Sequence, residues 1–275
     1  MSSTGATGPA ARRPVFSQRP TVIGHRGNGA GQVSGHLENT LESFAAALDS
    51  GTAWVELDVR RTADDDLAVV HNPADADGGY VVERTMPELA ALGIPSLRQV
   101  LDALPAHVGL DVDLKSSLED ALLPAERSTA ALLAPVLDEE RHRRELLVTS
   151  FDPAALLVLR ERVPRIPLGL LTWFTFPLHM AVAAAAHLGL DVIAAQVGSF
   201  RPDGRSARHR GAAHAIEVAH QAGLEVIAWC PSPAEAAELV RAGVDALVVD
   251  RVVGEAEQRG QPGQPARPNR PGQPT

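Results

Sequence analysis

Three consecutive segments decide the fold: TVIGHRG at residues 21–27, LESFAAALD at residues 41–49 and WVELDVR at residues 54–60. The first and third are short and rich in β-branched and apolar residues, whereas the second has the apolar spacing of a helix. A strand, a helix and a second strand in this order predict two parallel strands joined by a right-handed crossover. The chain therefore begins its fold with a βαβ unit.

The same alternation continues along the chain. Strand-like segments are expected at residues 21–27, 54–60, 108–115, 146–151, 167–173, 191–197, 225–230 and 246–250. Helix-like stretches lie between them, at residues 41–49, 97–104, 120–144, 154–162, 178–188, 212–222 and 233–242. Eight such units over about 230 residues predict a single-domain (β/α)8 TIM barrel rather than an open doubly wound sheet, which usually has fewer strands.

The two ends of the chain have compositions unlike the rest. Residues 1–20 contain a pair of arginines with no apolar run after them, so they lack the hydrophobic region of a secretory signal and predict a disordered leader. Residues 257–275 are rich in Pro, Gly and Gln and predict a disordered tail. The barrel is therefore expected over residues 21–256.

Charge and cysteine content exclude some functions. The net charge of -9 argues against nucleic acid as the main ligand, because affinity for a polyanion comes chiefly from Lys and Arg. The single cysteine, Cys230, excludes an intrachain disulfide and leaves no thiolate cluster for zinc. This usage fits a reducing compartment, and we expect a cytoplasmic protein.

One segment is apolar enough to be considered as a membrane span. Residues 166–190 contain no Asp, Glu, Lys or Arg, and this length could cross a bilayer. Pro167 and Pro177 interrupt it, so a buried strand followed by an alanine-rich helix is expected instead. No stable membrane insertion is predicted.

The side chains of WVELDVR alternate between two faces of the strand. Glu56 and Asp58 share one face, and Val55, Leu57 and Val59 share the other, which can pack under helices. Two carboxylates on the inner face of a strand repel each other unless a cation or a basic group lies between them. They predict a site for a hard metal ion, while a solvated edge strand with ordinary charges stays an open alternative.

The third strand, LDVDLK at residues 110–115, repeats this pattern. Asp113 and Lys115 come near the strand end and are expected at the barrel mouth, where active sites of this fold lie. Asp113 could complete a set of three carboxylates with the two of the preceding strand, whose oxygens suit Mg²⁺ or Ca²⁺ rather than zinc. Asp111 lies deeper, and we assign it no role.

Two of the ten histidines, His25 and His71, follow strand-like apolar runs close to these carboxylates. Because imidazole titrates near neutrality, two rings at strand ends suggest an acid-base couple in which one takes a proton and the other donates one. Arg26 adds a planar fork for phosphate oxygens, and Lys115 would face the same anion. Glu38, just before the first helix, is expected to orient His25 or Arg26.

Three further features leave alternatives open. Trp229, at the end of the seventh strand, either lines the mouth, where its ring could contact an alcohol or a choline-like head group, or packs in the core. Cys230 is expected to be an inert small residue, because nothing adjacent in the sequence would lower its pKa. Residues 28–37 form either a phosphate-covering lid or a flexible βα loop, and the loop is favoured.

Taken in order, these motifs resemble the glycerophosphodiester phosphodiesterase family over about residues 22–251. The matching motifs are His25-Arg-Gly, Glu38-Asn-Thr, Glu56-Leu-Asp, His71 and Asp113-Leu-Lys, with weaker echoes in Ile227-Ala-Trp and Gly243-Val-Asp. The resemblance implies a (β/α)8 barrel that hydrolyses a small-molecule glycerophosphodiester to glycerol 3-phosphate and an alcohol. Glycerophosphocholine is a representative substrate of this kind.

The resemblance also implies roles for single residues. It makes His25 and His71 the acid-base pair, Glu56 and Asp58 the ligands of a divalent cation, and Arg26 and Lys115 the phosphate-binding positions. Asp113 is expected to be the third ligand of the cation. Glu38 and Trp229 complete the predicted substrate site.

This chain departs from the family pattern at three places. Asp113-Leu-Lys115 stands where the family usually has Glu-x-Lys, so the third ligand is one methylene shorter. His71-Asn72 stands where the family often has His-Asp, which removes a charge beside the second histidine. The connection between Gly27 and Glu38 is longer than the usual proline-containing one.

Two other functions are considered. A lipid-cleaving barrel resembling the sphingomyelinase D-type phospholipases would need an apolar interfacial surface, and the sequence has no amphipathic basic helix suited to anionic membranes. A non-catalytic barrel could bind phosphorylated ligands after losing its chemistry through Asn72 and Asp113. Retention of both histidines argues against the latter.

Overall fold

The computed structural model describes residues 13–75, 77–201 and 210–252. Eight parallel strands close into a barrel, because the first of them pairs with both the second and the last. The barrel strands are β1 (Thr21–Gly24), β4 (Trp54–Arg61), β6 (Gly109–Leu114), β7 (Leu146–Ser150), β8 (Leu168–Thr172), β9 (Val192–Gln196), β10 (Glu225–Trp229) and β11 (Ala246–Val249). The predicted (β/α)8 barrel is confirmed, and every predicted strand overlaps an observed one.

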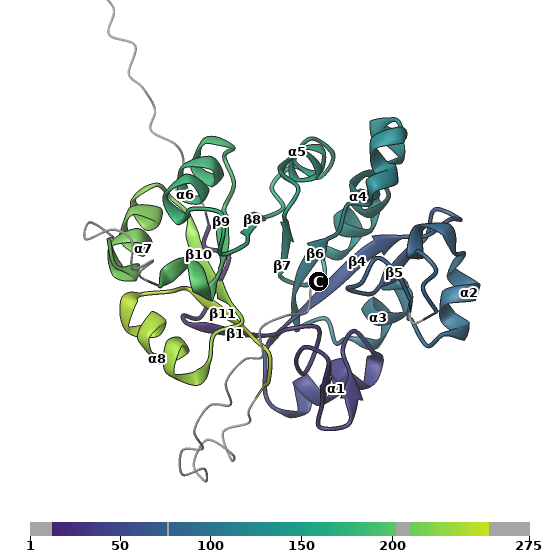
Figure 1. Cartoon of the computed structure of the whole chain (residues 1–275), viewed down its shortest axis with the longest axis horizontal. Helices are drawn as coiled ribbons and strands as arrows, with labels where there is room; N and C mark the ends of the chain where they lie inside the picture. Colours follow the sequence, from purple (N-terminus) through teal and green to yellow (C-terminus); the bar gives the residue numbers. More distant parts are fainter. Residues whose placement is uncertain (1–12, 76, 202–209, 253–275) are drawn as a thin grey trace, which may run out of the picture.

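The helices lie outside the ring of strands (Figure 1). They are α1 (Leu41–Asp49), α2 (Met86–Ala91), α3 (Leu97–Ala103), α4 (Thr129–Glu140), α5 (Pro153–Arg162), α6 (Leu178–His187), α7 (Ala212–Gln221) and α8 (Pro233–Ala242). The ends of α8 show how local sequence sets such bounds. Ser232 and Glu235 form a capping box at its start, and Gly243 ends it in the left-handed conformation at φ 96°.

One predicted helix is wrong in extent. The stretch at residues 120–144 is α-helical only over α4, and two short 3-10 helices precede it, η2 (Leu118–Leu122) and η3 (Ala125–Arg127). Pro124 between them has no backbone N–H to continue a helix. Ser128 then starts α4 afresh by accepting a hydrogen bond from the backbone N–H of Ala131.

The wide connection between the second and third barrel strands contains structure that the sequence did not predict. β5 (Leu67–Val69) runs antiparallel to β4 and extends the sheet beside the barrel. It is followed by η1 (Val81–Glu83) and α2, which were not predicted either, and then by α3, which confirms the predicted helix at residues 97–104. His71 therefore reaches the barrel mouth from β5 and not from a barrel strand.

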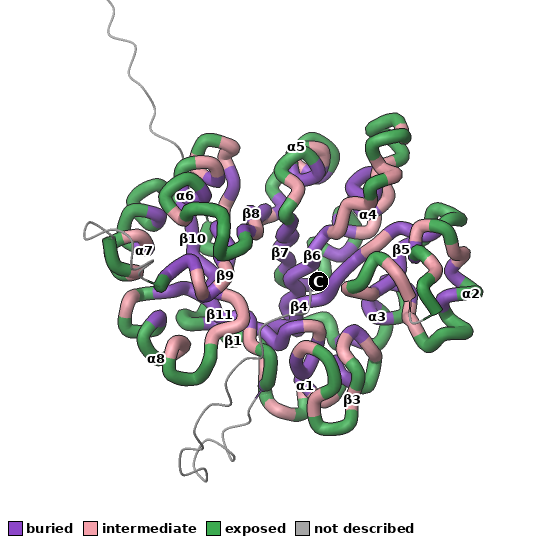
Figure 2. The backbone as a smooth tube through the Cα atoms, in the orientation of Figure 1, coloured by how far each residue is buried: buried purple, intermediate pink, exposed green. Residues whose placement is uncertain are grey.

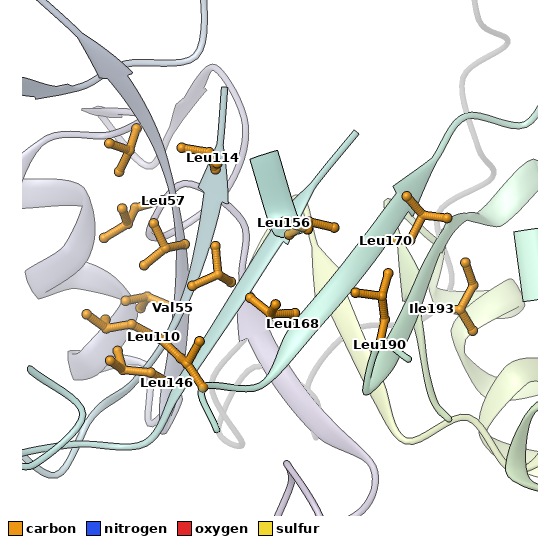
Figure 3. Close-up of a cluster of buried hydrophobic side chains, with 14 of the residues drawn as sticks. Val55, Leu57, Leu110, Leu114, Leu146, Leu156, Leu168, Leu170, Leu190 and Ile193 are labelled. Carbon is orange, nitrogen blue, oxygen red and sulfur yellow. The ribbon is translucent and has the colours of Figure 1, made fainter. Parts of the chain in front are cut away.

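The strands alternate in side-chain direction as the sequence predicted. Val55, Leu57 and Val59 of β4 are buried in the core between strands and helices. Figure 3 shows Val55 and Leu57 near Leu110 and Leu114 of the neighbouring β6, with Leu156 of α5 farther along the same cluster. Figure 2 shows how burial varies across the molecule: the strands at the centre are mostly buried, and the helices around them have exposed outer faces. Glu56 and Asp58 consequently point into the barrel.

A short N-terminal segment closes the floor of the barrel. Phe16 is 1% exposed, and its ring packs edge to face on Trp54 with centroids 5.2 Å apart. Gly109, paired with Trp54 across β4 and β6, makes room for the indole, because a Cβ there would lie 2.2 Å from it. The backbone N–H groups of Val15 and Phe16 donate to the carboxylate of Glu225.

The prediction that residues 1–20 form a disordered leader is therefore wrong for residues 13–20. Two adjacent apolar side chains are too short a run to predict burial, yet they fit the open lower end of the barrel. The rest of the predicted leader, residues 1–12, and the predicted tail, residues 257–275, lie outside the described residues.

A transmembrane span needs a long, apolar helix, and none of the helices in the described parts of the chain meets both conditions. The uncharged segment at residues 166–190 folds as β8 and α6, which confirms the predicted strand and alanine-rich helix.

Candidate active site

The parallel register of β4 and β6 brings three carboxylates together inside the barrel. Asp58 pairs with Asp113, and Glu56 pairs with Asp111 one inward step deeper. All four side chains are buried. Oxygens of Glu56, Asp58 and Asp113 lie within 4.8 Å of one another, and we call these three residues the acidic cluster. The predicted metal ligands thus converge.

The charge of the acidic cluster is only partly neutralised by its neighbours. Burial raises the pKa of Glu56 well above its ordinary value, and the charges of Asp58 and Asp113 raise it further. Burial, partly offset by Lys115, raises the pKa of Asp113 to about 6. Among the described residues, Asp113 Oδ1 is buried with no hydrogen-bond partner. These donors fit a divalent cation that prefers oxygen ligands.

Lys115 supplies a positive charge inside this site. Its Nζ lies 3.0 Å from Asp58 Oδ1 and also contacts Asp113 Oδ2. Burial opposes the charged form, but Asp113 and Asp58 raise the pKa of Lys115 above its ordinary value. Burial likewise opposes ionisation of Asp58, yet Lys115 and Arg26 hold the pKa of Asp58 well below its usual range. The lysine is therefore charged where the sequence predicted a phosphate contact.

Arg26 shapes the site through its backbone as well as its side chain. The turn after β1 holds Arg26 at φ 53° and Gly27 at φ 95°, and a Cβ on Gly27 would collide with α1. This turn directs the backbone N–H of Arg26 to Glu56 Oε2 at 2.8 Å. The guanidinium Nη1 donates to both oxygens of Glu38 at 2.9 Å, and Nε lies 3.3 Å from Asp58 Oδ2.

Two adjacent residues orient this arrangement. Glu38 was expected to orient His25 or Arg26, and in the structure it binds Arg26. Asn39, at φ 57°, donates from Nδ2 to Asp58 Oδ2 at 2.8 Å and accepts the N–H of Asp58 at 3.3 Å. Thr40, and not Asn39, caps α1 by accepting a hydrogen bond from the backbone N–H of Ser43. Asn39 therefore fixes the direction of one carboxylate of the acidic cluster.

The connection before Glu38 is more ordered than the flexible loop that was favoured. It contains the antiparallel pair β2 (Gln32–Val33) and β3 (His36–Leu37). The backbone N–H of Gly31 donates to the carboxylate of Glu38, which ties this hairpin to the Arg26 turn. A change in the hairpin would thus reach the site through Glu38.

His25 is held from one side by a residue at the opposite end of the chain. Its Nδ1 lies 2.6 Å from Asp250 Oδ1, and its Nε2 lies 3.8 Å from Glu56 Oε2. Burial opposes ionisation of Asp250, but the hydrogen bond and charge of His25 hold the pKa of Asp250 below its ordinary value. An ionised Asp250 accepts a hydrogen bond from Nδ1–H of His25. In a neutral ring the lone pair is then on Nε2, which faces the acidic cluster.

His71 approaches the acidic cluster from β5. Arg60 fixes its backbone by donating from Nε and Nη2 to the carbonyl of His71 at 2.9 and 2.7 Å. Burial lowers the pKa of His71, and the charge of Asp58 opposes this shift. The ring Nδ1 lies 2.9 Å from Asn72 Oδ1, so the asparagine keeps a hydrogen bond to the ring although it brings no charge.

Aromatic side chains lie at the carboxyl ends of three barrel strands, at the mouth. The ring of Trp229, the last residue of β10, lies 5.0 Å from that of Trp173 and 6.1 Å from that of Phe151, and the ring of Phe174 lies 5.5 Å from that of Trp173. We call these four residues the aromatic wall. The ring of Phe151 is 5.6 Å from Lys115 Nζ, so the wall adjoins the acidic cluster. Trp229 combines features of the two alternatives, because it is partly buried against the core and also contacts the rings at the mouth.

Comparison with known proteins assigns the chain to a family. Residues 25–253 match the model of the Glycerophosphoryl diester phosphodiesterase family. The chain belongs to this family. The resemblance drawn from the motifs is confirmed. Among curated family relatives, a glycerophosphodiester phosphodiesterase of Caldanaerobacter subterraneus subsp. tengcongensis is 24% identical over 250 residues, which cover 83% of this chain and 93% of the relative. One from Bacillus altitudinis is 29% identical over 177 residues, covering 58% and 66%.

Solved structures of phosphodiesterases share the barrel. A putative glycerophosphodiester phosphodiesterase from Galdieria sulphuraria aligns with a TM-score of 0.72 at 20% identity, covering 87% of this chain and 97% of the other. A phosphodiesterase from Oleispira antarctica, in complex with the product sn-glycerol-3-phosphate, aligns with a TM-score of 0.69 at 24% identity, covering 86% and 96%. At these identities the likeness shows the fold.

In this glycerophosphoryl diester phosphodiesterase family member, the structure brings together every site residue named from the sequence. It also adds residues that the sequence did not assign to the site, chiefly Asp250 and Asn39. Asp250 stands just after the last barrel strand, at the end where active sites form, and that position alone was a usable signal. Cys230, expected to be inert, lies 3.6 Å from His25 Nδ1, and burial together with Asp250 raises the pKa of its thiol.

Proposed function

We propose that this enzyme hydrolyses glycerophosphodiesters such as glycerophosphocholine to glycerol 3-phosphate and an alcohol, with a divalent cation and two histidines. The observation that carries the proposal is the buried acidic cluster at the barrel mouth, with Lys115 against it and His25 beside it. Three buried carboxylates are stable in the ionised form only beside cations, and Lys115 and Arg26 supply two positive charges for three acids.

The acidic cluster would hold Mg²⁺ or Ca²⁺ through carboxylate oxygens, including the unpartnered Oδ1 of Asp113. When bound, such a cation neutralises charge on a non-bridging phosphate oxygen. Lys115 binds a remaining phosphate oxygen. The Arg26 guanidinium binds another through the N–H groups that do not contact Glu38 or Asp58. Together they lower the cost of placing an anion beside buried acids.

The two histidines divide the proton transfers. Asp250 holds His25 with its Nε2 lone pair toward the cluster, which suits a general base that takes the proton of the attacking glycerol hydroxyl or water. His71 then donates a proton to the departing alkoxide. The burial that lowers the pKa of His71 makes its protonated ring the stronger acid, and the phosphate anion favours that protonated form when substrate is bound.

The aromatic wall receives the leaving alcohol. Its rings can attract a choline-like head group by cation-π contact while Lys115, beside Phe151, stays with the phosphate. Glycerophosphocholine matches both features, because its quaternary ammonium is separated from its phosphate by a short chain.

The function is tested by incubating the full chain with glycerophosphocholine and measuring glycerol 3-phosphate, with and without a chelator. Release that stops with chelator and returns with Mg²⁺ or Ca²⁺ supports the proposal. Release of choline phosphate would place the cleavage at the other ester bond, and binding without turnover would favour a non-catalytic barrel. Faster cleavage of a lysophospholipid than of glycerophosphocholine would favour the lipid-cleaving alternative.

The proposal also covers the setting of the enzyme. We place the catalytic barrel at residues 21–256 and the enzyme in the cytoplasm, which the single cysteine supports. The substrate is a small molecule and not a nucleic acid, in keeping with the net charge of -9.

A further inference from the structure

A second group of metal-binding atoms lies on the other side of the His25 ring. His25 Nδ1, Cys230 Sγ and Asp250 Oδ1 come from residues just after β1, β10 and β11, which are neighbours in the barrel. The sulfur lies 3.6 Å from Nδ1 and 3.2 Å from Oδ1, and Nδ1 lies 2.6 Å from Oδ1. We call these three residues the mixed cluster.

The donor atoms of the mixed cluster differ in kind from those of the acidic cluster. One nitrogen, one sulfur and one oxygen are typical of zinc, whereas Mg²⁺ and Ca²⁺ prefer oxygen alone. The two clusters also face opposite edges of one imidazole, because Glu56 approaches Nε2 and the mixed cluster contains Nδ1. Two ions of different chemistry would therefore not compete for the same atoms.

The spacing is close to that of a tetrahedral zinc site. With Zn–S of about 2.3 Å and Zn–N and Zn–O of about 2.0 Å, tetrahedral angles separate sulfur from the other donors by about 3.5 Å and nitrogen from oxygen by about 3.3 Å. The two sulfur distances already approach this value. The Nδ1 to Oδ1 distance must open, and the Asp250 side chain is 50% exposed, so it can rotate.

The other two donors are held in place. The backbone N–H of Cys230 donates to the carbonyl of Val248 at 2.9 Å, and that of His25 donates to the carbonyl of Val249 at 3.2 Å. Both side chains therefore start from backbone anchored to β11. The exposed side of Asp250 leaves room for solvent to supply the fourth ligand of an open zinc site.

We propose that His25, Cys230 and Asp250 form an inhibitory site for Zn²⁺ or another thiophilic divalent cation. Binding breaks the S–H bond of Cys230 and forms a metal–sulfur bond, and the released proton goes to solvent. His25 binds through the lone pair of Nδ1, so its ring proton moves to Nε2. Asp250 exchanges its hydrogen bond with His25 for a bond to the metal.

The inhibition follows from the position of that proton and rests on the function proposed above. With Nδ1 on the metal and a proton on Nε2, His25 has no lone pair left for a substrate proton. Giving up the Nε2 proton would require an imidazolate, so the ring is also a poor acid. The ion thus blocks His25 without touching the acidic cluster or the substrate.

Binding can be tested without any activity assay, because Cys230 is the only thiol of the chain. Cd²⁺ is added to the full chain in excess Mg²⁺, and the Cd–thiolate absorption is followed in the ultraviolet. We expect one Cd²⁺ per chain and at least a tenfold slower alkylation of Cys230 in the presence of Zn²⁺. Mg²⁺ alone should give neither effect.

Variants locate the ion. Cys230→Ser keeps a hydroxyl that can donate to Asp250 but loses the soft donor, and Zn²⁺ affinity should fall at least tenfold. Asp113→Ala, in the acidic cluster, should leave the Cd–thiolate signal unchanged. An absent signal in the wild type, or equal Zn²⁺ affinity in Cys230→Ser, overturns the site.

The activity measurement separates this proposal from the function. Low Zn²⁺ in excess Mg²⁺ should inhibit hydrolysis of glycerophosphocholine in the wild type, and Cys230→Ser should resist it. A Cd–thiolate signal in a protein without hydrolytic activity would support metal binding by the mixed cluster and contradict the proposed function. If Zn²⁺ inhibits hydrolysis equally in wild type and Cys230→Ser, the mixed cluster is not the inhibitory site, and the proposed hydrolytic function is still supported.

Discussion

Asp250 lies 225 residues beyond His25 in the sequence, and its Oδ1 is 2.6 Å from Nδ1 of that histidine. The contact joins the residue after the first barrel strand to the residue after the last, and β1 and β11 pair along their whole length. Its chemical role is to decide which nitrogen of His25 carries the proton.

Asp250→Asn should lower kcat by a factor of about 10² or more while changing KM little. The amide can offer an N–H to Nδ1, which favours the ring tautomer with its proton on Nε2, the wrong one for a base. Steady-state kinetics with glycerophosphocholine measure the effect. An unchanged kcat, with Mg²⁺ saturating, would show that the contact is only structural.

Replacing either histidine of the proposed pair should remove most turnover. General acid-base catalysis contributes about 10² to 10⁴ in rate, so His25→Ala and His71→Ala should each lose an amount of that order. Circular dichroism and melting temperature should stay near those of the wild type, since both side chains lie at the mouth and outside the apolar core. Near-normal activity in both variants would contradict the pairing.

Asp113 should decide cation affinity. Asp113→Ala removes the buried unpartnered oxygen and should abolish the rise in melting temperature that Mg²⁺ or Ca²⁺ gives the wild type. A ligand that binds only the folded state stabilises it by about 2.7 kcal/mol at one hundred times its Kd, which a thermal shift detects easily.

Asp113→Glu provides the matched comparison, because it restores the length of the usual family ligand. Its cation-dependent thermal shift should persist, with the order of Mg²⁺ and Ca²⁺ affinities changed. Equal thermal shifts in wild type and Asp113→Ala would exclude this residue as a ligand.

Asp111 should make stability depend on pH. Burial raises the pKa of Asp111 to about 8, from an ordinary 3.8, although a hydrogen bond from Thr149 opposes the shift. The folded state therefore binds more protons than the unfolded state between these values, and stability falls as pH rises from about 4 to about 8. Asp111→Asn keeps the acceptor for Thr149 and removes the charge.

The gain in melting temperature from Asp111→Asn should therefore be larger at pH 8 than at pH 5, measured in chelator. Asp138→Asn, on the exposed surface of α4, is the control and should not reproduce this trend. A gain that does not change with pH would mean that Asp111 is ionised in the folded protein.

Phe16 should stabilise the barrel floor. Phe16→Ala leaves a cavity against Trp54 and should cost about 3 to 5 kcal/mol of unfolding free energy. Phe174→Ala, with a ring that is half exposed at the mouth, should cost far less. Urea denaturation of the two variants compares them directly, and equal losses would refute a packed floor.

The barrel and its inward-facing acids were predictable because both follow from local periodicity. WVELDVR alternates strictly, so the face on which Glu56 and Asp58 lie is set by the sequence once the strand is recognised. The order of strands and helices then fixes parallel pairing, which places strand ends together at one mouth.

What escaped prediction depends on contacts between distant residues. Phe16 has no periodic neighbours to suggest burial, and its partner Trp54 lies on another element. Asp250 gains its role only when β11 closes against β1, and Asn39 only when the turn at Arg26 brings it to Asp58. The stretch before α4 was predicted to be helical because composition outweighed the single break at Pro124.

The tryptophans are divided between the two ends of the barrel, so the intrinsic fluorescence of the protein reports on both ends. Trp54 is sealed in the floor, whereas Trp173 and Trp229 belong to the aromatic wall, and the chain has no fourth tryptophan. A quencher or ligand arriving at the mouth should change the emission of the two upper indoles and spare the lower one. Unfolding should shift all three, so intrinsic fluorescence can distinguish an occupied mouth from a loosened barrel.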